Sequence, residues 1–179
     1  MTPIVNPENE GITFVLGGAR SGKSQFAERF VASLPRPWVY IATAEAHDDE
    51  MAARIADHQA RREAHWETIE APHELPQAIS AAPNDAVVLV DCLTLWLSNV
   101  MHGPFDVKRS MDQLEEALRG RENATVLVSN EVGLGLVPET PLGRAFRDAQ
   151  GRLNQRIAAA ASRVVFVVAG QPLIVKGST

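Results

Sequence analysis

A glycine-rich segment near the start of the chain limits the possible folds more than any other feature. It follows an apolar run at residues 12–16, precedes a helix-like stretch, and reads Gly17-Gly18-Ala19-Arg20-Ser21-Gly22-Lys23-Ser24. The order of strand, glycine-rich loop, Lys-Ser and helix is that of a phosphate-binding loop. The chain is therefore expected to fold around a strand, a loop and a helix in direct succession.

The residue types of this loop suit phosphate binding. Gly17 and Gly22 allow successive amide N–H groups to point inward at the positive end of a helix, which makes an anion site. Lys23 can reach the terminal phosphates of a nucleoside triphosphate, and the Ser24 hydroxyl is placed to bind Mg²⁺. The alternative is a glycine-rich turn with a solvated lysine, which leaves the flanking strand and helix unexplained.

Composition narrows the class of protein. The 179 residues carry 17 basic and 22 acidic side chains, for a net charge of -5, which argues against a general nucleic-acid binder. Cys92 is the single cysteine, so no internal disulfide can form. The first ten residues lack a secretory pattern and the longest apolar runs are strand-length. We therefore expect a soluble, cytoplasmic protein without membrane insertion.

Apolar runs alternate with helical patterns along the chain. Strands are predicted at residues 12–16, 38–42, 86–90, 125–128 and 164–168, with a shorter one at 66–69. Helices are predicted at residues 24–34, 48–62, 74–81, 93–101, 106–119 and 141–162. Runs that are apolar on both faces and separated by helices indicate a mostly parallel sheet covered on both sides. We predict one doubly wound α/β domain over residues 11–179, preceded by a poorly ordered extension at residues 1–10.

Acidic side chains follow two of the predicted strands. Asp91 ends an all-apolar strand, where proteins of this type hold magnesium through a carboxylate. The alternative is that Asp91 caps the helix that begins near Leu93. Cys92 beside it is interpreted as a buried side chain, because no basic residue stands nearby in the sequence to lower its pKa. Glu70 could accept hydrogen bonds from a base or ribose, or be an ordinary surface acid.

A histidine lies among arginines on the predicted helix 48–62. Offsets of four, three and four residues place Arg54, His58, Arg61 and Arg62 within one broad face. Three guanidinium groups favour neutral imidazole, which can attack phosphorus, and they would neutralise a triphosphate. Against this, Met51 and Ile55 share its flank, and an isolated helical histidine is more often a packed or boundary residue than a catalyst. Helix geometry alone leaves catalytic and structural roles open.

A glycine-punctuated apolar loop follows the predicted strand at 125–128. It begins with the polar pair Asn130-Glu131 and ends at Pro138-Glu139. Such a loop could close over a large, partly apolar substrate or pack against another subunit.

Beyond Gly11 the chain resembles the bifunctional adenosylcobinamide kinase / adenosylcobinamide-phosphate guanylyltransferase family of cobalamin biosynthesis. The helix around His58 and the loop at 130–139 are the most specific parts of the resemblance. Its further motifs are the phosphate loop, Tyr40-Ile41-Ala42-Thr43, residues 48–55 with Arg62, Trp66 with Thr68 and Glu70, the Asp91 strand, Phe146-Arg147-Asp148 and Asn154-Gln155.

The resemblance implies a fold, substrates and two reactions. The fold would be a phosphate-loop (P-loop) NTPase domain of the RecA-like type, in a homotrimer. ATP or GTP, with Mg²⁺, would phosphorylate adenosylcobinamide. A histidine would then take GMP from GTP and pass it to adenosylcobinamide phosphate, giving adenosylcobinamide-GDP. Because cleavage at the γ- and α-phosphorus asks for different geometry, either the nucleotide binds in two poses or the helix that carries His58 moves. We predict that helix 48–62 moves toward the phosphate loop when GTP binds.

Matched position by position, the resemblance implies that His58 is the nucleophile and that Lys23 is catalytic. The implied GTP contacts are Gly17, Gly18, Ala19, Arg20, Ser21, Gly22, Lys23, Ser24, Ala42, Thr43, Ala44, Gln59, Ala60, Arg61, Arg62, Glu70 and Asp91; the magnesium ligands are Ser24 and Asp91. The chain departs from the family in two places. Asp57 precedes His58 where some members have adjacent histidines, and Glu63 stands where proline is frequent.

Two other functions fit the same sequence. One is a plain small-molecule kinase in which His58 is structural. The other is a nucleotide-dependent interaction module in which hydrolysis changes the shape of the 130–139 loop.

Overall fold

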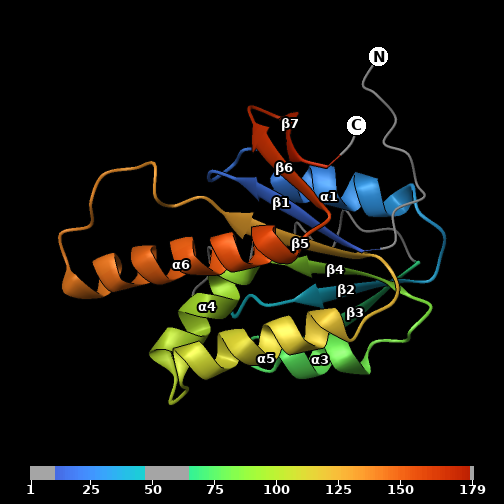
Figure 1. The fold of residues 1–179 in the computed structure, drawn as a ribbon, viewed down its shortest axis with the longest axis horizontal. Helices are drawn as coiled ribbons and strands as arrows, with labels where there is room; N and C mark the ends of the chain where they lie inside the picture. The colour runs from blue at the N-terminus through green and yellow to red at the C-terminus, as the bar shows by residue number, and fades with distance from the viewer. Residues whose placement is uncertain (1–10, 47–64, 178–179) are drawn as a thin grey trace.

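The computed structural model describes residues 11–46 and 65–177. Within these ranges seven strands form one sheet, in the order β3-β2-β4-β5-β1-β6-β7 (Figure 1). The strands are β1 (Ile12–Gly17), β2 (Trp38–Ala42), β3 (Trp66–Glu70), β4 (Val87–Asp91), β5 (Thr125–Asn130), β6 (Arg163–Val168) and β7 (Gln171–Lys176). All neighbours pair in parallel except β6 and β7, which are antiparallel. The predicted mostly parallel, doubly wound sheet is confirmed.

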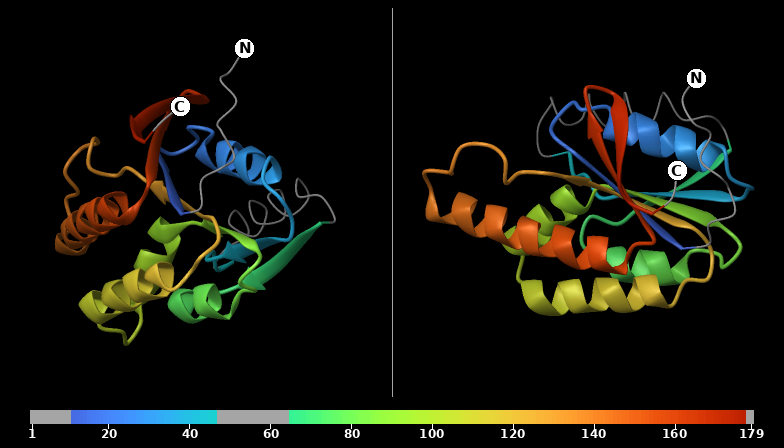
Figure 2. Two further views of the ribbon diagram at one scale, coloured as in Figure 1. Left: turned by 45° about the vertical axis from the view of Figure 1, so that its right-hand side comes forward. Right: turned by 45° about the horizontal axis from the view of Figure 1, so that its top comes forward.

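The described helices cover both faces of this sheet. They are α1 (Lys23–Ala32), α3 (Leu75–Ala81), α4 (Leu93–His102), α5 (Val107–Arg119) and α6 (Pro141–Ala160). The left view of Figure 2 shows α1 on one side of the sheet and α3, α5 and α6 on the other. The predicted helix 48–62 and the predicted extension 1–10 lie outside the described residues.

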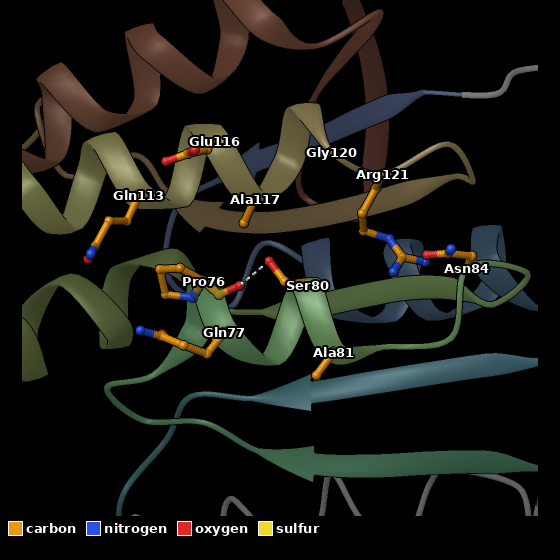
Figure 3. Close-up of a pocket in the computed structure, with 10 residues that line it drawn as sticks. All are labelled: Pro76, Gln77, Ser80, Ala81, Asn84, Gln113, Glu116, Ala117, Gly120 and Arg121. Carbon is orange, nitrogen blue, oxygen red and sulfur yellow. Dashed lines mark hydrogen bonds between the residues drawn. The ribbon is translucent and has the colours of Figure 1, made fainter.

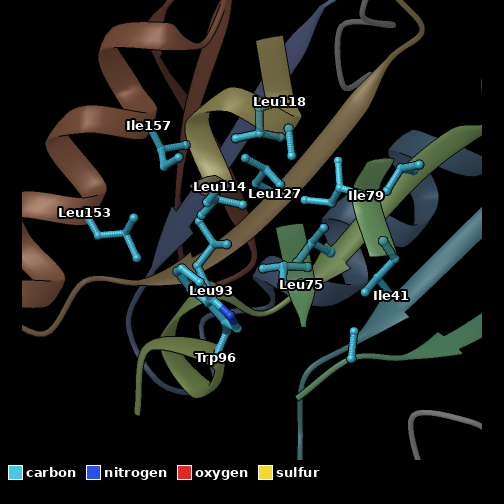
Figure 4. Close-up of a cluster of buried hydrophobic side chains, with 14 of the residues drawn as sticks. Ile41, Leu75, Ile79, Leu93, Trp96, Leu114, Leu118, Leu127, Leu153 and Ile157 are labelled. Atoms are coloured by element: carbon cyan, nitrogen blue, oxygen red, sulfur yellow. The ribbon is translucent and has the colours of Figure 1, made fainter. Parts of the chain in front are cut away.

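Each face of the sheet has its own apolar core. Side chains of α1 pack with Val15, Tyr40 and Leu89 in one cluster. The larger cluster joins α3, α4, α5 and α6 to the opposite face, where Trp96 and Leu127 are fully buried (Figure 4). Strands such as β4, with four consecutive buried residues, are apolar throughout because both of their faces are covered.

Capping residues set several helix starts close to their predicted positions. The Asp106 carboxylate accepts a hydrogen bond from the Arg109 amide, 2.7 Å away, at the start of α5. The Thr140 hydroxyl caps α6 in the same way, and Pro141 occupies the first turn. Side-chain acceptors at this position satisfy amides that the helix leaves unpaired, which is why these boundaries are readable from sequence.

One strand was not predicted. β7 turns back antiparallel to β6 through Ala169 and Gly170, both with positive φ. Its side chains alternate between exposed and half-buried, so it has no continuous apolar run. The predicted short strand 66–69 is confirmed as β3, which pairs with β2 along its whole length. No helix in the described ranges combines the length and apolar character needed to cross a membrane.

Candidate active site

The loop between β1 and α1 has the backbone form of an anion site. Gly22, the residue before α1, has φ 91°, and Arg20 also adopts a left-handed conformation with φ 57°. The Ser21 amide donates to the Gly18 carbonyl at 3.3 Å, which closes the turn. Left-handed residues between right-handed ones turn successive amide groups into a concavity at a helix N-terminus. The predicted strand, loop and helix succession is confirmed.

Other atoms approach two glycines of this loop closely. A Cβ on Gly17 would lie 2.4 Å from Ser21 Oγ and 2.7 Å from the Val167 carbonyl oxygen. A Cβ on Gly22 would lie 3.2 Å from the Cα of Gly170. The Gly170 amide also donates to the Ser21 carbonyl at 2.8 Å. The turn between β6 and β7 therefore supports the loop from behind, a contact that sequence reasoning missed.

Lys23 lies folded against its own loop. Its Nζ donates to the Gly18 carbonyl at 3.1 Å, and the side chain is buried. Burial lowers the pKa of Lys23, while the nearby Cys92 and Asp91 act in the opposite direction. Asp91, at the end of β4, is thus close enough to Lys23 for their charges to interact. The structure brings together the lysine and the acid that the sequence placed 68 positions apart.

Asp91 is not the cap residue of the following helix. That position is Cys92, whose side chain makes no capping hydrogen bond, and the Asp91–Cys92 peptide bond is cis. Cys92 is buried, as predicted, and burial together with the Asp91 charge raises the pKa of its thiol to about 11. Lys23 is a basic neighbour that the sequence did not reveal, but its charge is outweighed by burial. A thiol in this state is a poor nucleophile.

Hydrogen bonds of Thr43 join the end of β2 to the turn formed by Asp91 and Cys92, the acidic turn. The Thr43 hydroxyl donates to the Cys92 carbonyl at 2.7 Å and accepts from the Cys92 amide at 2.8 Å. The Thr43 carbonyl accepts from Asn99 of α4 at 2.9 Å. Thr43 is completely buried, so its hydroxyl bonds the backbone of Cys92 and does not face solvent. Ala42 and Ala44 on either side of it are half-buried.

A buried polar network stands behind the end of β5. The side chains of Ser129, Gln150 and Asn154 are linked by hydrogen bonds of 2.8–2.9 Å. Asn154 also donates to the Asn130 carbonyl, and Thr94 accepts from the Asn130 amide. Gln150 was not singled out from the sequence, because a polar residue facing a neighbouring strand end cannot be told from a solvated one by helical spacing alone.

The loop after β5 is anchored at its base and apolar at its tip. Arg147 donates to the Gly133 carbonyl, and Arg144 donates to the carbonyls of Pro138 and Glu139. Leu134 and Leu136 at the tip are 82% and 96% exposed. The prediction that this loop packs against substrate or subunit is untested in a single chain.

A separate groove of about 620 Å³ lies between α3 and α5 (Figure 3). Ser80, Gln113 and Arg121 are among its lining residues. Arg121 there donates to four backbone carbonyls, of Ile79, Ala82, Pro83 and Ala86. No predicted site residue in the described part of the chain lines the groove, and α1 with its phosphate loop is on the other face of the sheet. We assign the groove no part in nucleotide binding.

Comparison with known proteins shows the family to which the chain belongs. A family model described as cobinamide kinase / cobinamide phosphate guanyltransferase matches residues 13–175. The chain belongs to this family. The family resemblance drawn from the sequence motifs is therefore confirmed.

Two curated relatives agree with the family assignment. The chain is 48% identical over 166 residues to the bifunctional adenosylcobalamin biosynthesis protein CobP of Pseudomonas aeruginosa, covering 91% of this chain and 96% of the relative. It is 44% identical over 173 residues to the bifunctional adenosylcobalamin biosynthesis protein CobU of Salmonella typhimurium, covering 87% and 94%. Among solved structures it resembles the PH0250 protein of Pyrococcus horikoshii OT3, with TM-score 0.56, 8% identity and coverage of 95% and 87%. At that identity the likeness concerns the fold alone.

The structure places some of the family's predicted site residues together and leaves others undescribed. The phosphate loop, Asp91 and residues 42–44 lie at the carboxyl ends of β1, β4 and β2. Glu70 is exposed at the end of β3, the edge strand of the sheet. His58 and the predicted contacts Gln59, Ala60, Arg61 and Arg62 lie outside the described residues.

Proposed function

We propose that this protein performs both reactions of its family at the phosphate loop: phosphorylation of adenosylcobinamide, and GMP transfer from GTP to adenosylcobinamide phosphate. The observation that carries the proposal is that Lys23, in a glycine loop shaped for phosphate, and Asp91 lie at the same edge of the sheet, in a chain that matches the family over residues 13–175. Together they supply the cation and the carboxylate that phosphoryl transfer needs.

In the first reaction the loop amides hold the triphosphate of ATP or GTP, contacted by residues 17–24. Lys23 exchanges its bond to the Gly18 carbonyl for one to a terminal phosphate oxygen. The Ser21 hydroxyl, which is buried and without a hydrogen-bond partner in the described structure, is available to the same phosphates. A buried hydroxyl without a hydrogen-bond partner, beside a loop shaped for an anion, is available to bind a phosphate oxygen.

Ser24 and Asp91 fit a magnesium ion bound with the nucleotide. Ser24 is half-buried in the first turn of α1, and Asp91 ends the strand two places from β1 in the sheet. Hydroxyl and carboxylate oxygens are ligands that Mg²⁺ prefers, usually with nucleotide phosphates completing its shell. When bound, the ion would neutralise charge on the transferring phosphoryl group.

In the second reaction His58 is the nucleophile. A bond forms from an imidazole nitrogen to the α-phosphorus of GTP as the bond to pyrophosphate breaks. A phosphate oxygen of adenosylcobinamide phosphate then displaces the imidazole, giving adenosylcobinamide-GDP. Residues Ala42, Thr43, Ala44, Gln59, Ala60, Arg61, Arg62 and Glu70 are proposed to hold the GTP in this step. Thr43, with a buried hydroxyl, would act through its backbone or by positioning its neighbours.

Incubation with GTP labelled at the α-phosphorus tests the transferase reaction. We expect the protein to retain label as an acid-labile GMP adduct, and His58→Ala to abolish it. His102→Ala is the matched control, because His102 is exposed at the end of α4, where the Ser98 carbonyl is the one hydrogen-bond partner of its ring among the described residues. A protein that phosphorylates adenosylcobinamide but never retains label would be the plain kinase, and a protein that turns over neither substrate would be the interaction module.

The proposal includes a cytoplasmic homotrimer, as the family resemblance implies. Light scattering should then give a particle of about three times the 19.4 kDa chain mass. A mass equal to one chain, at concentrations where both reactions proceed, would remove the trimer from the proposal.

A further inference from the structure

The first residue after β5 lies between the phosphate loop and the acidic turn. β5 separates β1 from β4 in the sheet, and Gly17 pairs with Asn130 in the register of β1 and β5. The amide of the next residue, Glu131, donates to the Gly17 carbonyl at 3.1 Å. Glu131 is therefore attached directly to the beginning of the phosphate loop.

The Glu131 carboxylate is held in one orientation. Its Oε1 accepts from the Gly133 amide at 2.6 Å, and the Gly133 carbonyl accepts in turn from Arg147. A Cβ on Gly133 would lie 2.8 Å from Oε1, so this orientation of the carboxylate requires glycine at position 133. In hydrogen bonds between described residues, the Glu131 carboxylate takes part through Oε1 alone. The second oxygen has no such bond, and the side chain is half-buried.

The backbone that carries Glu131 is fixed from behind. The preceding residue, Asn130, is bonded through its amide to Thr94 at 2.7 Å and through its carbonyl to Asn154 at 3.1 Å. Both partners belong to the buried network with Ser129 and Gln150. A catalytic group needs this kind of support, because a displacement of an ångström costs most of its effect.

Other described carboxylates at this edge of the sheet are less well placed for chemistry at the loop. Asp91 is proposed above to hold magnesium. Glu45 follows β2 and Glu70 ends β3, and both strands lie beyond β4 in the strand order. A plain structural role for Glu131 would be to close the tight turn to Gly133. That role uses one oxygen and does not require a position beside Gly17.

We propose that Glu131 is the general base of the phosphorylation reaction, which rests on the kinase half of the proposed function. The acceptor hydroxyl oxygen bonds to the γ-phosphorus while the bond from that phosphorus to the β,γ-bridging oxygen breaks. The hydroxyl proton passes to the Glu131 carboxylate, and the electron pair of the broken bond stays on the nucleoside diphosphate. GMP transfer to neutral His58 removes no hydroxyl proton and has no need of this base.

Glu131→Gln separates these two steps. The amide oxygen of glutamine can still accept from the Gly133 amide, so the turn is kept. We expect kcat for phosphorylation of adenosylcobinamide by ATP to fall about 100-fold or more, with KM little changed, while GMP adduct formation from GTP stays within about threefold of wild type. Glu122→Gln is the control, because Glu122 is exposed at the opposite end of β5 and should leave both activities unchanged.

Gly133→Ala provides a second variant in which the carboxylate is present but displaced. It should also lower kcat for phosphorylation more than it lowers adduct formation. The proposal is overturned if Glu131→Gln retains phosphorylation, or if both activities fall together, since a joint loss marks a structural role. A wild-type protein that forms the adduct but never phosphorylates adenosylcobinamide would instead refute the kinase half of the proposed function, and Glu131 with it.

Discussion

Replacement of Thr43 by valine tests whether the acidic turn is held by one buried hydroxyl. Valine has nearly the shape of threonine but cannot donate to the Cys92 carbonyl or accept from the Cys92 amide, bonds of 2.7 and 2.8 Å. Thr43 is completely buried and Cys92 nearly so. Neither backbone group of Cys92 would therefore find water as a replacement partner.

The expected magnitude follows from these two lost bonds. The Cys92 amide would be left without a partner, which costs about 1–3 kcal/mol, whereas the Cys92 carbonyl keeps a bond from the Trp96 amide at 3.2 Å. With about 1 kcal/mol for the lost bond to that carbonyl, the free energy of unfolding should fall by about 2–4 kcal/mol. For a chain of this size about 3 kcal/mol corresponds to a fall in Tm of roughly 6–12 °C. It also corresponds to a fall of about 1 M in the urea midpoint.

Thr43→Ser is the matched control for this prediction. Serine keeps the hydroxyl and loses one buried methyl group, which costs about 1 kcal/mol. The urea midpoint should therefore be highest for wild type, lower for Thr43→Ser and lowest for Thr43→Val. Nucleotide affinity should fall with valine and much less with serine, because Cys92 adjoins Asp91. Equal midpoints for the two variants would refute the reasoning.

Two further predictions follow from the pKa shifts at the site. Burial lowers the pKa of Lys23, so the charged lysine destabilises the folded state at neutral pH, and this penalty is relieved as pH rises toward the ordinary value of 10.5. Lys23→Met should therefore leave the free energy of unfolding near neutral pH unchanged or higher. Nucleotide affinity, measured by calorimetry, should fall at least about tenfold. A large loss of stability would contradict this. The Cys92 thiol, with its pKa raised from 9.0 to about 11, should stay unlabelled by iodoacetamide at about pH 8 until urea unfolds the protein, and its contribution to stability should be lost as pH rises above 9.0. Equal labelling rates in folded and unfolded protein would count against the buried position.

Several parts of the site could be predicted because their causes are local. The phosphate loop depends on glycines at positions 17 and 22, and the positive φ of Gly22 is a property of that residue. Asp91 was placed at a strand end because the run before it is apolar on both faces. The role of His58 stays a prediction from the family resemblance, since that residue lies outside the described ranges.

The amino-acid sequence by itself determined the phosphate loop, the parallel sheet and the family, because backbone conformation and strand burial are encoded within a few consecutive residues. Only the tertiary structure decided that the Gly170 turn supports that loop, that Thr43 binds Cys92 across 49 positions, and that Glu131 is attached to Gly17. These contacts join segments whose residues are ordinary in their own surroundings. They exist because the sheet brings the carboxyl ends of its parallel strands to one edge, where hydrogen bonds form between residues far apart in the chain.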